Sequence, residues 1–92
     1  MAATQGYEAL AVSGTAVGCT AATAANASSM HFRPEGGAVR YRSDGTAPTA
    51  TVGTPLFDGE SLEVRGKDFW QRIQFISKDG GAVTVHAHYF RD

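Results

Sequence analysis

Hydrophobic and polar residues alternate with a period of two near the end of the chain. Over 82–90, one face of an extended strand would carry Val83, Val85, Ala87 and Tyr89, and the other Thr84, His86, His88 and Phe90. This period is typical of a half-buried β-strand. Residues 72–77 alternate similarly, and the Lys-Asp-Gly-Gly segment at 78–81 tolerates the positive φ of a tight turn. We therefore predict a β-hairpin over 72–90.

A second hairpin is predicted for 29–33 and 38–42, joined by the Pro-Glu-Gly-Gly turn at 34–37. Its inward residues would be Met30, Phe32, Val39 and Tyr41, and its outward residues His31, Arg33, Arg40 and Arg42. A slip of one residue would exchange the two sets. Three arginines on one face would either be solvated or contact an acidic protein surface, a phosphate or a glycan, because arginine is enriched at interfaces.

Weaker signals complete the predicted fold. Residues 7–12 and 61–65 read as strands, whereas 45–55 reads as a loop because two prolines and two glycines interrupt it. The alanine-rich stretch 19–27 lacks large apolar anchors, so we expect it to be irregular or a single helical turn. The pattern predicts an all-β fold, a compact antiparallel β-sandwich or small barrel of about 6–8 short strands. Its expected core is Phe32, Tyr41, Leu62, Val64, Ile73, Phe75, Val83 and Val85.

The length and the net charge of the chain limit the classes of protein to which it can belong. The 92 residues fit one β-domain over 1–92, in which 1–27 forms an N-terminal arm or an edge strand. With 8 Lys and Arg against 9 Asp and Glu, the formal net charge of −1 gives no field that attracts nucleic acid or an anionic membrane. The sequence has no long apolar run and no signal-peptide pattern. We therefore expect a soluble protein, made in a cytoplasm, that binds neither membrane nor specific nucleic acid.

The residues with reactive side chains form no recognised catalytic or metal-binding motif. His86 and His88 share a strand face, but zinc would need a third ligand, and nothing in the spacing brings His31 or Cys19 to them. The single Cys19 has no partner for an internal disulfide and no adjacent cation to activate its thiol. Phosphate-loop, dinucleotide-binding and serine-hydrolase motifs are absent from the sequence. We expect no enzyme activity, no cofactor and no metal, and we interpret the histidine pair as a surface or interface feature.

Trp70 follows Phe69 directly before a predicted strand. Such a tryptophan can be an interface anchor, a platform on which a sugar stacks, or part of the core. The sequence pattern leaves these alternatives open.

The central part of the chain reads Arg-Tyr-Arg-Ser-Asp-Gly-Thr-Ala-Pro-Thr over 40–49, followed by Val52-Gly53 and by the turn and strand of 56–64. This string resembles small virion structural proteins of tailed phages and prophages. The resemblance implies a non-enzymatic β-sandwich, with a capsid cement or decoration protein as the preferred role and a neck or tail protein as an alternative. It also implies that the protein is located in the virion, that the major capsid protein or other virion proteins are its partners, and that it forms a homo-oligomer, preferably a trimer.

The same string is also similar to a hairpin of chitobiase-like sandwich modules, which implies a carbohydrate-binding or adhesion module as a further alternative. In both families Asp44-Gly45 would turn the chain and Pro48 would stiffen its return, so the string reports on fold before function. For a virion protein, we expect the residues that contact partners to be Arg33, Arg40, Arg42, Trp70, His86 and His88.

Overall fold

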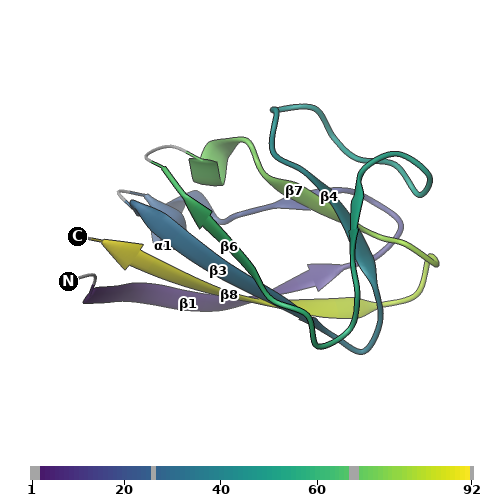
Figure 1. Cartoon of the computed structure of the whole chain (residues 1–92), viewed down its shortest axis with the longest axis horizontal. Helices are drawn as coiled ribbons and strands as arrows, with labels where there is room; N and C mark the ends of the chain where they lie inside the picture. The colour runs from purple at the N-terminus through teal and green to yellow at the C-terminus, as the bar shows by residue number, and fades with distance from the viewer. Residues whose placement is uncertain (1–2, 26, 67–68, 92) are drawn as a thin grey trace.

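The protein consists of two stacked antiparallel sheets of four strands each (Figure 1). The computed structural model describes residues 3–25, 27–66 and 69–91. The first sheet contains, in spatial order, β1 (Ala3–Val12), β8 (Val83–Arg91), β3 (Ser29–Glu35) and β6 (Leu62–Arg65). The second contains β2 (Val17–Gly18), β7 (Gln74–Ser77), β4 (Val39–Arg42) and β5 (Thr54–Leu56). The predicted all-β antiparallel sandwich is confirmed.

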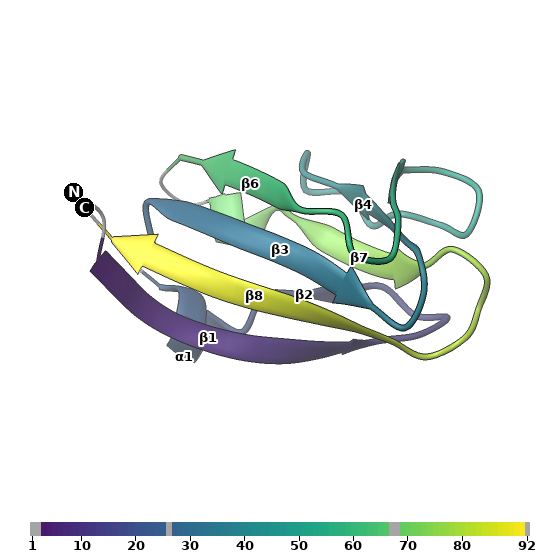
Figure 2. The same ribbon diagram turned by 60° about the horizontal axis from the view of Figure 1, so that its bottom comes forward.

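The strand orders β1-β8-β3-β6 and β2-β7-β4-β5 define a jelly roll, in which two Greek keys wrap around one core. Among the described strands, β4 and β5 are the one consecutive pair that shares a sheet; every other connection crosses between the layers. β1 lies at the edge of the first sheet and pairs with β8 from Ala3 opposite Arg91 to Val12 opposite Val83. The two ends of the chain consequently lie side by side at one end of the molecule (Figures 1 and 2).

Both predicted hairpins are wrong, although most of their strands are present. β7 and β8 belong to different sheets, as do β3 and β4. Alternation reveals which face of a strand is buried, and two such strands can face each other across a core as well as lie side by side. The end of β7 instead bonds to other segments, because the N–H of Ser77 donates to Ser13 O (2.9 Å) and that of Lys78 to Ala38 O (3.0 Å).

The core lies between the two sheets and matches the predicted alternation. Phe32, Ile73, Phe75, Val83 and Val85 are buried, and the other predicted core residues, Tyr41, Leu62 and Val64, are partly buried against them. The rings of Phe32 and Phe75 join β3 to β7 across the core, with centroids 4.9 Å apart. Alternating inward residues thus give this small domain one shared apolar interior.

The segments outside the sheets are short. The helix α1 (Ala21–Ala24) is a single turn, as predicted for 19–27, and the 3-10 helix η1 (Phe69–Gln71) precedes β7. The predicted loop over 45–55 extends two residues too far, because β5 starts at Thr54. β5 includes Pro55, which is tolerated because β5 is an edge strand. Over the described part of the chain, we find no helix with the length and apolar character needed to cross a membrane.

Candidate functional site

The three arginines expected on one face are divided between the two layers. Arg33 lies on β3 of the first sheet, whereas Arg40 and Arg42 lie on β4 of the second. The predicted arginine patch is therefore wrong, because it depended on a β3–β4 hairpin that does not form. Each arginine has to be considered in its own surroundings.

Arg40 holds the loop of the β4–β5 hairpin in place. Its Nε donates to the carbonyl of Ala50 and its Nη1 to the carbonyl of Gly53, each across 2.9 Å. Gly53 has a φ of 138°, and a Cβ there would meet the Cβ atoms of Arg40 and Pro48 at 3.2 Å. Glycine can adopt this backbone conformation and pack this closely, whereas any other residue at 53 would be strained.

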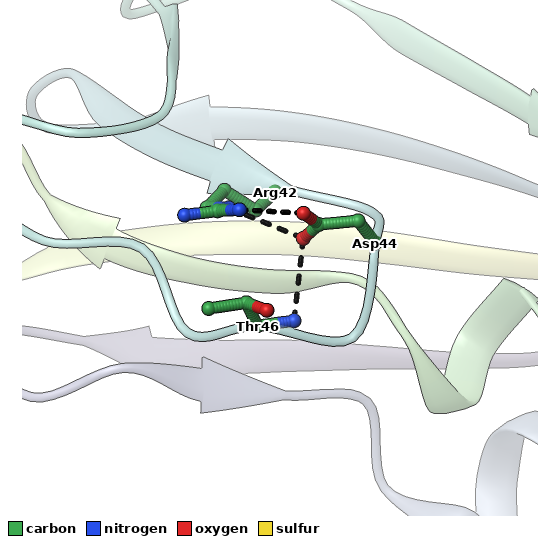
Figure 3. Close-up of polar contacts among 3 residues, drawn as sticks. All are labelled: Arg42, Asp44 and Thr46. Carbon is green, nitrogen blue, oxygen red and sulfur yellow. Dashed lines mark hydrogen bonds and ion pairs between the residues drawn. The ribbon is translucent and has the colours of Figure 1, made fainter.

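Arg42 and Asp44 form an ion pair at the start of the same loop (Figure 3). Arg42 Nη2 lies 2.5 Å from Asp44 Oδ2 and Nε lies 3.1 Å from Oδ1, which also accepts the backbone N–H of Thr46 at 3.2 Å. The hydrogen bonds from Arg42, and secondarily the one from Thr46, hold the pKa of Asp44 below its ordinary value of 3.8. The carboxylate closes an Asx turn in which Gly45 supplies a φ of 88°.

The last turn of this loop, next to β5, exposes an apolar side chain. Thr49 and Val52 exchange backbone hydrogen bonds, and the hydroxyl of Thr49 also accepts the N–H of Val52 at 3.0 Å. Val52 itself is 49% exposed. A hollow of about 310 Å³ lies beside the hairpin and is lined by Tyr41, Arg42, Ser43, Asp44, Val52, Gly53 and Thr54. We call four of these lining residues, Arg42, Asp44, Val52 and Thr54, the hairpin platform.

A second group of polar and aromatic side chains lies on the outer face of the first sheet. Tyr7 Oη is 2.6 Å from His86 Nδ1, and His86 Nε2 is 2.9 Å from Glu35 Oε1. The rings of Tyr7 and His88 lie 4.8 Å apart, and His31 pairs with His88 across β3 and β8. All three histidines of the chain therefore share this face. Within the described segments, no three His, Cys, Asp or Glu residues are grouped so that they could hold a metal ion.

Trp70 and Cys19 both pack against the core. Trp70 lies in η1, where its ring is partly buried and packs against the core, and its contact with a partner stays a prediction. Burial raises the pKa of the Cys19 thiol to about 11, which leaves almost no thiolate at neutral pH. Beside Cys19, the hydroxyl of Tyr89 donates to Glu8 Oε2 across 2.6 Å, and the N–H of Thr20 donates to the same oxygen across 3.0 Å.

Sequence reasoning identified His86, His88 and Arg33 as surface residues but missed Tyr7, Glu35 and Val52. The alternation of β1 does place Tyr7 outward. Its contact with His86, however, depends on the pairing of β1 with β8, and the two residues are 79 positions apart in the sequence. Comparisons of the chain with family models, curated proteins and solved structures gave no match.

Proposed function

We propose that this protein is a non-enzymatic structural subunit of a phage virion, a capsid cement or decoration protein that bridges neighbouring shell subunits. The observation that supports the proposal most directly is the set of hydrogen bonds and the ion pair that hold the loop of the β4–β5 hairpin. The string that carries the resemblance to virion proteins, 40–49 followed by Val52-Gly53, covers most of β4 and of the loop that Arg40 and Arg42 hold in place. Its distinctive residues therefore hold one surface loop that exposes the apolar side chain of Val52.

A rigid platform suits a protein that has to dock on a symmetric lattice. Arg40, the Arg42–Asp44 pair and the Thr49–Val52 turn fix the loop at three points, so docking orders few additional side chains. By fold-level analogy a jelly roll also fits the role, because viral capsid domains are among the proteins that use this fold. In this proposal the major capsid protein is the partner, and the subunits act as a trimer whose several weak contacts add up.

Rebinding to particles that lack the protein tests this proposal. Virions are purified from a host in which the gene is deleted, mixed with the purified chain, and the bound copies are counted by quantitative mass spectrometry. We expect saturable binding at a fixed ratio to the major capsid protein. Val52→Asp should reduce the bound copies at least about 10-fold, because it replaces the exposed apolar side chain of the platform by a charge.

A matched variant separates a specific loss from a general one. Ala9→Asp introduces the same charge at an exposed position of β1, in the opposite layer. It should bind like the unmodified chain, and Arg42→Glu should bind like Val52→Asp. Equal binding of Val52→Asp and the unmodified chain would exclude the hairpin platform as the docking surface. Absence of any saturable binding would contradict the proposed function.

A further inference from the structure

A polar hollow lies where β3 and β8 of the first sheet meet the connection between β5 and β6. Its volume is about 290 Å³, and it is lined by Arg33, Pro34, Glu35, Asp58, Gly59 and His86. One wall is the Phe57–Glu60 turn, which is joined to β3 because the N–H of Gly59 donates to Pro34 O across 3.0 Å. The turn is also closed internally, since Glu60 Oε1 accepts the N–H of Phe57 at 2.7 Å. The hollow is therefore preformed.

The side chains around the hollow have hydrogen-bonding capacity to spare. Arg33 is exposed, and in the described segments no carboxylate lies within ion-pair distance of its guanidinium. The carboxylate of Glu35 accepts from His86 Nε2 through Oε1, which leaves Oε2 open. On the other side of the ring, His86 Nδ1 forms a hydrogen bond with the hydroxyl of Tyr7. This chain of contacts fixes the orientation of both His86 and Glu35.

The charges around the hollow select a class of ligand. The lining carries charges of both signs, because Arg33 is a cation and Glu35 and Asp58 are carboxylates, so an anion faces two like charges and a cation faces one. A neutral ligand with several hydroxyl groups meets neither penalty, because each hydroxyl can both donate to a carboxylate and accept from the guanidinium. The ring of Tyr7, 49% exposed and stacked beside His86 with an interplanar angle of 15°, adds an apolar surface next to these polar groups.

We propose that the hollow formed by Arg33, Glu35, Asp58 and His86 binds a neutral saccharide, with the Tyr7 ring as a flanking stacking surface. The hollow is at the lower end of the roughly 300–1,000 Å³ of small-molecule sites, so one or two sugar residues fit it. The hollow shares no lining residue with the hairpin platform, so the two surfaces can be altered separately. Many copies on one particle would strengthen a weak single site through avidity.

A glycan array carrying neutral, sialylated and sulfated oligosaccharides tests the proposal. The biotinylated full chain is presented on labelled streptavidin, so that weak sites act together. We expect signal on neutral glycans above the signal of Arg33→Gln protein. The methyl glycoside of the terminal sugar of the strongest neutral glycan is then titrated into the ¹⁵N-labelled chain, and we expect chemical-shift changes in β3, β8 and the Phe57–Glu60 turn.

The variants are chosen to keep the fold. Arg33→Gln and Asp58→Asn each change one exposed group, and each should weaken the binding of the methyl glycoside at least about 10-fold. Arg65→Gln changes an exposed arginine of the same sheet that pairs with Glu63 instead, and should leave binding within about twofold. Signal confined to charged glycans, no signal above the Arg33→Gln background, or equal weakening by Arg65→Gln would each overturn the proposal. None of these results bears on particle binding.

Discussion

The guanidinium of Arg40 lies 2.9 Å from the carbonyl oxygen of Gly53 and donates a hydrogen bond to it, thereby tying the last turn of a long loop to the strand from which the loop starts. From the sequence, Arg40 was expected to contact a partner. In the structure, two of its five N–H groups donate within the hairpin, to Gly53 and to Ala50. Of the other two arginines expected to act together with it, Arg42 pairs with Asp44, whereas Arg33 has no ion-pair partner among the described residues.

Replacing Arg40 should loosen the hairpin loop. Arg40→Met keeps the length of the side chain but removes both hydrogen bonds, so we expect a loss of about 1–2 kcal/mol in the free energy of unfolding. Amide hydrogen exchange should become faster in 48–53 and remain unchanged in β8. Arg72→Met, which alters an exposed arginine outside the hairpin, is the control and should have little effect on either measurement. Unchanged exchange in 48–53 would show that the loop does not depend on Arg40.

Asp44 should make the folded state sensitive to acid. Its pKa is lower in the folded chain than its ordinary value of 3.8, so its contribution is fully present above that pH and is lost as the pH falls through the lowered pKa. Asp44→Asn should therefore lower the urea midpoint at pH 7, and the midpoint should change less than that of the unmodified chain between pH 5 and pH 2. Asp79→Asn, in an exposed turn, controls for the general effect of removing a carboxylate. Parallel acid profiles for Asp44→Asn and the unmodified chain would rule out this contribution.

Cys19 should react slowly with thiol reagents while the chain is folded. A rise in its pKa from 9.0 to about 11 reduces the thiolate fraction at pH 8 about 100-fold. We expect Ellman's reagent to modify the folded chain at least 100 times more slowly than the chain in urea, since burial also restricts access. Comparable rates in the two states would mean that this thiol is not held against the core.

The fold class could be predicted from the sequence, whereas the topology could not. Strict alternation in 83–89 assigns Val85 to the core and His86 to the surface, and the structure agrees. The same alternation contains no information about which strand lies beside which. The jelly roll pairs β1 with β8 and β3 with β8, contacts that depend on long-range packing. A local turn signal such as 78–81 therefore marks a change of direction, and the chain uses it to cross between sheets.

The candidate site could likewise be predicted from the sequence only where its chemistry is local. Asp44-Gly45 was recognised as a turn because its chemistry is local, and the Asx turn closed by Asp44 and Thr46 agrees with that reading. The hollow at Arg33 and His86 brings together β3, β8 and the Phe57–Glu60 turn, which are distant in sequence. Residues that come together only after both sheets have formed have no fixed spacing in the sequence, so no sequence motif identifies them.

Cryo-electron microscopy of intact particles, prepared with and without this gene product, tests the central claim most directly. The account predicts additional density at symmetry-related positions on the shell, each large enough for one or more jelly rolls, with the β4–β5 hairpin facing the major capsid protein. Identical maps, together with no copies of the chain in purified particles by mass spectrometry, would contradict it.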